Sequence, residues 1–206
     1  ILSPATSGRE LTSTALSATQ AITIRIKNLD DVVSAGDINV SYSINGGPAV
    51  NEVITTPTAD IAAGGTLSHT FATTANLSAT GTYSIVVTAT KASDPVTTNN
   101  SQTTVYKQLT NGTINNAQLP WLDNFETATV QNITMDQMGL DGNDRYDFVN
   151  NGIYGQAKTF IHTGMAYSGS KALTLDQSRF VSGGSVDSLT GTFNLATFNT
   201  ATDDIR

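Results

Sequence analysis

The chain has 206 residues, a length that fits one large β domain or two domains of about 100 residues each. Only 13% of its residues are charged, against about 25% in a typical globular protein, and the net charge is −7. Because nucleic acids and anionic membranes attract clusters of Lys and Arg, this acidic chain is expected to bind neither. The absence of Cys excludes disulfides and thiolate metal sites. No apolar run approaches about 18 residues, so we expect no membrane insertion.

Alternation of branched apolar and polar residues is the clearest pattern in the first half of the chain. Ile22, Ile24 and Ile26 alternate with polar residues, and a strand places such neighbours on opposite faces. The same pattern predicts strands at residues 10–16, 20–29, 37–45, 49–55, 66–72, 82–90 and 103–107. Short strands with turns every 8–12 residues or so are typical of a seven-stranded, immunoglobulin-like sandwich, here over residues 1–107.

Three local features of this region carry their own predictions. Asn45-Gly46 supplies positive φ for a tight hairpin turn. Tyr83 stands at the start of the penultimate strand, where a tyrosine corner bonds its hydroxyl to nearby backbone; ligand contact is the alternative. His69 shares a strand face with Leu67 and Phe71, so we expect a partly buried, hydrogen-bonded structural histidine.

A family resemblance runs through this first region. Residues 22–29, 34–36, 40–46, 63–66, 81–83 and 98–101 together resemble a CARDB-type module. That family consists of seven-stranded, immunoglobulin-like adhesion or spacer domains of bacterial surface proteins, and the resemblance implies the same for residues 1–107. The sequence departs from the family at Leu29-Asp30-Asp31, where a small residue more often follows Asn, so a differently shaped turn is expected there.

The second half of the chain has a different residue pattern and more aromatic residues. Residues 108–119 form a predicted linker, because Asn111-Gly112, Asn115-Asn116 and the following Pro120 break any regular pattern. The only Trp and a denser set of aromatic residues then predict a second β domain with a bulkier core over residues 120–206. Its predicted strands cover residues 121–126, 145–150, 158–162, 171–177, 186–195 and a last one from 203.

Residues 119–126 resemble the opening of MAM-like and related jelly-roll domains. Residues 168–175 resemble their small-residue turn with the strand that follows, and residues 187–198 resemble the next long strand. The resemblance implies an incomplete jelly-roll β-sandwich, because that fold needs about eight strands and this segment supplies fewer. Either the chain is part of a longer protein, which we favour, or a partner completes the sheet. The pairing of the two modules resembles large extracellular or cell-surface proteins of Bacteroidota. Many of these leave through the type IX secretion system, and some serve gliding motility or adhesion.

Patterns that support catalysis are missing from the sequence. It has no Gly-x-Ser-x-Gly, no His-Glu-x-x-His and no phosphate-binding glycine loop. Of its two histidines, His69 is assigned a structural role, and His162 could border a groove of the second domain. Asp203 and Asp204 are neighbours on a predicted strand and point to opposite faces, so they do not form a catalytic pair. We therefore expect a chain that is not an enzyme.

The best candidate for a metal site is the acidic segment 141–147. Its oxygen-bearing side chains, which could wrap a hard cation such as Ca²⁺, are Asp141, Asn143, Asp144 and Asp147. Glu126 could join them from a distance, and this structural Ca²⁺ is the only cofactor expected. The segment is not an EF-hand, because Tyr146 stands where that motif requires Gly. The alternative is a turn whose carboxylates cap backbone amides.

Trp121, Tyr154 and Tyr167 are the candidate ligand-binding residues, because exposed aromatic rings in a groove stack against sugars; burial would instead favour a spacer role. The leading hypothesis is a non-catalytic adhesion or spacer segment. In it the first module spaces and the second binds surface glycan, protein or other domains of the same long chain. The alternatives are an accessory region of a secreted hydrolase such as a metalloprotease, and a carbohydrate-binding lectin module.

Overall fold

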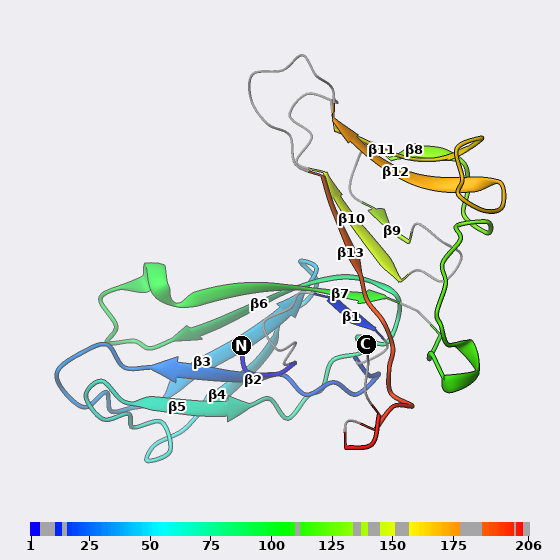
Figure 1. The fold of residues 1–206 in the computed structure, drawn as a ribbon. Helices are drawn as coiled ribbons and strands as arrows, with labels where there is room; N and C mark the ends of the chain where they lie inside the picture. The colour runs from blue at the N-terminus through cyan, green and yellow to red at the C-terminus, as the bar shows by residue number, and fades with distance from the viewer. Residues whose placement is uncertain are drawn as a thin grey trace. The chain divides into compact units, whose positions relative to one another are not determined.

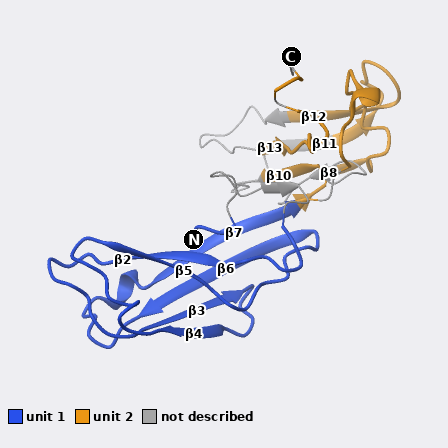
Figure 2. Ribbon diagram, turned by 90° about the horizontal axis from the view of Figure 1, so that it is seen from below, with its two compact units in different colours: residues 1–108 blue, residues 109–206 orange. Residues whose placement is uncertain are grey.

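The computed structural model describes residues 1–4, 11–13, 16–109, 112–133, 137–139, 145–150, 157–177, 187–199 and 201–203. Within these residues the fold is all-β (Figure 1), with two single-turn 3-10 helices, η1 (Thr97–Asn99) and η2 (Asn116–Gln118). The chain divides into unit 1, Ile1–Gln108, and unit 2, Leu109–Arg206 (Figure 2). Among the described residues, no helix has both the length and the hydropathy of a membrane span.

Unit 1 is a β-sandwich built from two sheets. The larger has the strand order β1-β7-β6-β3-β4, and the smaller pairs β2 with β5. The strands are β1 (Leu11–Ser13), β2 (Thr23–Lys27), β3 (Ile38–Ile44), β4 (Val50–Ile54), β5 (Thr66–Thr70), β6 (Gly81–Thr90) and β7 (Ser101–Leu109). Each strand predicted for residues 1–107 overlaps one of these, so the all-β prediction is confirmed.

The core of unit 1 lies between these two sheets. Ile24 of β2 is buried with Val40 of β3 and Ile85 of β6, and Phe71 at the end of β5 joins the same cluster. Burying a side chain of this size contributes about 1.5–3 kcal/mol. The alternation that begins at Ile22 therefore places the isoleucines of β2 against the larger sheet.

Two of the local predictions for unit 1 are confirmed. Asn45 and Gly46 have φ angles of 51° and 70°, as a tight hairpin turn between β3 and β4 requires. The hydroxyl of Tyr83 donates a hydrogen bond of 2.7 Å to the carbonyl oxygen of Ala79, which makes the predicted tyrosine corner.

The described residues of unit 2 form two antiparallel three-stranded sheets, with the orders β13-β10-β9 and β12-β11-β8. The strands are β8 (Gln131–Ile133), β9 (Gln137–Met138), β10 (Tyr146–Asn150), β11 (Ala157–Thr163), β12 (Lys171–Gln177) and β13 (Asp187–Gly191). Phe148 of β10 and Ile161 of β11 are fully buried and connect the two sheets in one core. Four of the predicted strands coincide with β10 to β13. Asp203 is not in a strand, and residues 204–206 lie outside the described part.

The predicted strand at residues 121–126 is wrong. The side chain of Asp123 accepts a hydrogen bond from the N–H of Phe125, and that of Asn124 accepts one from the N–H of Glu126. Phe125 also has a φ of 56°, which a strand does not allow. Asp and Asn have bent the backbone by bonding to it locally, against the β preference of their aromatic neighbours.

The predicted linker at 108–119 also differs from the structure. Gln108 and Leu109 are buried residues of β7. Ile114 is buried in unit 2, and its N–H donates to the carbonyl oxygen of Asn194 at 2.9 Å. Asn115 then caps η2, so the second part of this segment is folded into unit 2.

Candidate functional site

Trp121 packs within unit 2. Its ring meets that of Phe193 edge to face, with centroids 4.9 Å apart. The buried guanidinium of Arg145 lies 4.9 Å from the centroid of the Trp121 ring. Such a cation–π contact contributes about 0.5–2 kcal/mol. Trp121 is half-buried, and because Arg145 covers a face of the ring, the structure favours a role in packing over sugar stacking for this residue.

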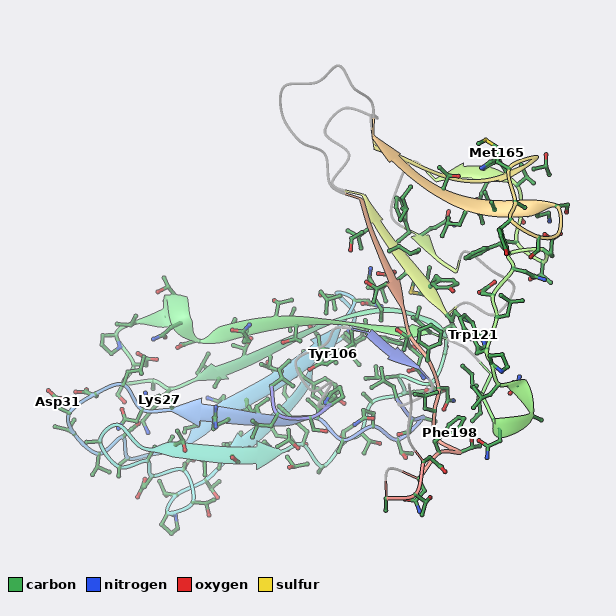
Figure 3. All side chains as sticks on the ribbon, viewed as in Figure 1. Lys27, Asp31, Tyr106, Trp121, Met165 and Phe198 are labelled. Atoms are coloured by element: carbon green, nitrogen blue, oxygen red, sulfur yellow. The ribbon has the colours of Figure 1, made fainter. Side chains whose placement is uncertain are left out.

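Tyr167 is in the opposite situation. It lies on the turn between β11 and β12, residues 164–170, which we call the exposed turn; Figure 3 labels its Met165. Tyr167 is fully exposed, and Met165 is 82% exposed. The rest of the turn consists of Gly, Ala and Ser, so these are its two large side chains. Tyr154, the third aromatic candidate, lies outside the described residues.

The exposed turn is held in place by Glu126. One carboxylate oxygen accepts hydrogen bonds from the N–H groups of Ser170 and Lys171 at 2.7 and 2.8 Å, and the other accepts the Ser170 hydroxyl at 2.6 Å. The ammonium of Lys171 donates in return to the carbonyl oxygens of Glu126 and Ala128, at 2.8 and 2.7 Å. We call this set of bonds the Glu126–Lys171 clamp. It fixes one end of the turn to the segment before β8.

The clamp also explains two further properties of this region. The Ser170 hydroxyl, followed by the N–H groups of Lys171 and Ser170, holds the pKa of the Glu126 carboxyl below its ordinary value. Gly169 has a φ of 76°, and a Cβ at this position would lie 2.9 Å from the carboxyl carbon of Glu126. Glycine is therefore required both for the backbone angle and for the close approach of the carboxylate.

The structure describes two of the predicted metal ligands, Glu126 and Asp147. Asp141, Asn143 and Asp144 lie outside the described residues. Asp147 is buried on β10, and the Glu126 carboxylate accepts hydrogen bonds at both oxygens within the clamp. The described part of the chain contains no group of three or more His, Asp or Glu residues that could hold a metal ion. The structure thus brings Glu126 to the exposed turn, a role that sequence reasoning missed.

The histidines have structural contacts. His69 Nε2 lies 2.9 Å from a carboxylate oxygen of Glu52, and its ring meets Phe71 edge to face. The predicted hydrogen-bonded, partly buried histidine is thereby confirmed, and the pair links β5 to β4 across the two sheets of unit 1. His162 Nε2 lies 2.8 Å from the Thr174 hydroxyl, a bond between neighbouring strands of unit 2.

A shallow hollow of about 410 Å³ lies on the face of unit 1 formed by β3, β4 and β6. It is lined by Asn39, Val40, Ser41, Asn51, Glu52, Val53, Thr88 and Thr90. Apart from Glu52, whose carboxylate bonds to His69, the lining is uncharged. The sequence analysis did not predict this hollow; the small polar residues that alternate with the core residues of β3 were its only signal.

Comparisons with protein-family models, with curated proteins and with solved structures find no match to this chain.

Proposed function

We propose that the chain is a non-catalytic adhesion segment of a secreted or cell-surface protein. In this proposal unit 1 is a CARDB-like, immunoglobulin-like spacer. Unit 2 is part of a jelly-roll-like module that binds glycan or protein through the exposed turn. The observation that carries the proposal is the full exposure of Tyr167 on a turn that the Glu126–Lys171 clamp holds in place.

Physical reasons connect this turn to binding. A tyrosine offers a flat apolar ring together with a hydroxyl, a combination that suits contact surfaces that are partly wet. Covering a side chain the size of Tyr167 or Met165 contributes about 1.5–3 kcal/mol. Because the clamp fixes one end of the turn before any ligand arrives, ordering the turn on binding costs less entropy.

The internal bonds of unit 1 support its role as a spacer. The buried side chain of Gln108 on β7 donates to the carbonyl oxygen of Leu16 at 3.1 Å and accepts from its N–H at 3.3 Å. The Tyr83 corner and the pair of His69 with Glu52 add further ties between distant segments. Hydrogen bonds that join distant segments are what we expect of a spacer with a fixed shape.

The test is a glycan array probed with the full chain and with variants of the exposed turn. We expect Tyr167→Ala to weaken binding by about tenfold or more, equivalent to about 1.4 kcal/mol. Tyr167→Phe should retain most of the binding affinity. Leu122→Ala is the matched control, because Leu122 is 75% exposed elsewhere in unit 2. Unchanged binding by Tyr167→Ala, or no glycan bound by the wild type, would contradict the glycan form of the proposal.

A further inference from the structure

A second exposed apolar surface lies on unit 1, in the connection from β2 to β3. Leu29, Val32 and Val33 are 69%, 63% and 60% exposed, and all lie within residues 29–33, which we call the apolar loop. Figure 3 labels Asp31 on this loop, at one end of unit 1. Single exposed aliphatic residues are ordinary, whereas contiguous exposed apolar patches mark interaction sites.

The apolar loop has a fixed shape, because the buried side chain of Asn28 organises it. The Asn28 amide donates to the carbonyl oxygens of Val32, Ile61 and Ala62 at 2.8, 3.1 and 3.2 Å. Its oxygen accepts the N–H of Asp30 at 3.0 Å. The bond to Val32 closes the loop on itself, and the other two tie it to the segment that follows β4.

The far end of the loop is anchored as well. Ser34 and Ile61 exchange two backbone hydrogen bonds of 2.8 and 3.0 Å. Leu29, Val32 and Val33 are therefore presented from a loop that is secured on both sides. A partner that covers them gains apolar burial while ordering little new chain.

Acidic side chains outnumber basic ones around the apolar loop. Asp30 and Asp31 lie within it, and Asp60 accepts the N–H of Gly36 just beyond it. The nearby ammonium of Lys91 donates to the carbonyl oxygen of Gly36 at 2.7 Å. Lys27, exposed at the end of β2, lies two residues before Leu29. The described surroundings of the loop thus combine an apolar centre with the carboxylates of Asp30, Asp31 and Asp60 and the ammonium groups of Lys27 and Lys91, so that carboxylates are in excess.

We propose that the apolar loop is a docking surface for a protein partner with an apolar centre edged by Lys or Arg. Charge complementarity selects this occupant, because opposite charges across an interface favour association and like charges oppose it. A symmetric contact with a second copy would place Asp30 and Asp31 near their own counterparts. An anionic membrane would be repelled in the same way. This surface belongs to unit 1, so the inference is independent of binding through the exposed turn of unit 2.

The test uses the ¹⁵N-labelled full chain and two synthetic amphipathic peptides that share the same Leu positions. One peptide has Lys at its polar positions, and the other has Glu. We expect the Leu/Lys peptide to shift the amide signals of residues 29–33 in a saturable way. The Leu/Glu peptide should bind more weakly, by about tenfold or more. Added salt should reduce this difference, because it screens the carboxylates.

Variants separate the apolar and the charged contributions. The triple variant Leu29→Ser, Val32→Ser, Val33→Ser should no longer bind the Leu/Lys peptide. The control Val53→Ser, at a residue of β4 that is 54% exposed, should bind this peptide as the wild type does. Asp30→Asn with Asp31→Asn should make the two peptides bind alike. These positions are exposed, so the variants should fold, which their amide spectra will verify.

Three results would overturn the inference. The first is the absence of shifts at residues 29–33 with the Leu/Lys peptide. The second is equal binding of both peptides to the wild type at low salt. The third is a wild-type chain that sediments as a dimer while the triple serine variant is a monomer, because a second copy of the chain would then be the occupant.

Discussion

The Tyr83 hydroxyl closes the turn before β6 by bonding to a carbonyl four residues earlier in the chain. Removing that hydroxyl leaves the carbonyl of Ala79 to water and loosens the entry into β6. A bond of this kind contributes about 0.5–1.5 kcal/mol to stability. We expect Tyr83→Phe to lower the free energy of unfolding of unit 1 by that amount, measured by urea unfolding followed through the amide signals of β6.

The control for this prediction is Tyr167→Phe, which removes a hydroxyl from a fully exposed tyrosine of unit 2. It should leave the urea midpoint unchanged. If both variants unfold at the same urea concentration as the wild type, the Tyr83 bond contributes nothing measurable, and the tyrosine corner is a feature of geometry alone.

At the scale of the elements, we expect the Glu126–Lys171 clamp to make the stability of unit 2 depend on pH, because it holds the connection from β11 to β12. The fold lowers the pKa of Glu126 from its ordinary value of 4.5, so folding favours the ionised carboxylate. The stabilisation is complete above about pH 4.5 and is lost as the pH falls through the lower pKa of the folded state. We expect the melting temperature of unit 2 to fall in this acidic range.

Trp121 fluorescence can follow this transition, because the ring of the only Trp packs in unit 2. Glu126→Gln should melt lower than the wild type at neutral pH and should lack this component of the acid dependence. Asp203→Asn, at a carboxylate elsewhere in unit 2, is the control and should keep it. Parallel pH profiles for Glu126→Gln and the wild type would show that the clamp does not stabilise the fold.

For the molecule as a whole, the sequence predicts unit 1 better than unit 2 for a physical reason. β2, β3 and β6 of unit 1 each have one buried face, so Ile24, Val40 and Ile85 alternate with polar residues and reveal the sandwich. In unit 2 the consecutive residues 145–148 are all buried, so alternation is lost and only the density of apolar residues marks β10. Local bonding by Asp123 and Asn124 then overrides strand preference, which the sequence pattern does not show.

The candidate sites follow the same logic. Tyr167 could be named from the sequence because exposed aromatic residues bind ligands. The clamp that anchors its turn could not, because it joins positions 44 and 45 residues apart. The sequence could not distinguish Trp121 from Tyr167, because no residue near Trp121 in the sequence indicates its contact with Arg145. The apolar loop was visible only as an unusual turn, since the Asn28 bonds that shape it include partners 33 and 34 residues away.

Calcium at the acidic segment 141–147 is a further proposal, and it concerns the stability of unit 2 as a whole. An ion that binds only the folded state stabilises it by mass action, by about 2.7 kcal/mol at a concentration of 100 times Kd. Calcium sites of extracellular modules have Kd values of about 0.1–1 mM. We therefore expect about 10 mM Ca²⁺ to raise the melting temperature of unit 2 by several degrees, and a chelator to reverse the change.

Matched variants assign that response to particular residues. Asp141→Asn with Asp144→Asn should abolish it, whereas Asp30→Asn with Asp31→Asn removes the same charge from unit 1 and should not. Glu126→Gln should keep the response, because both oxygens of the Glu126 carboxylate already accept hydrogen bonds in the clamp. Loss of the response in Glu126→Gln alone would place the ion at the clamp. Equal melting in Ca²⁺ and in chelator would leave segment 141–147 as a turn whose carboxylates serve backbone amides.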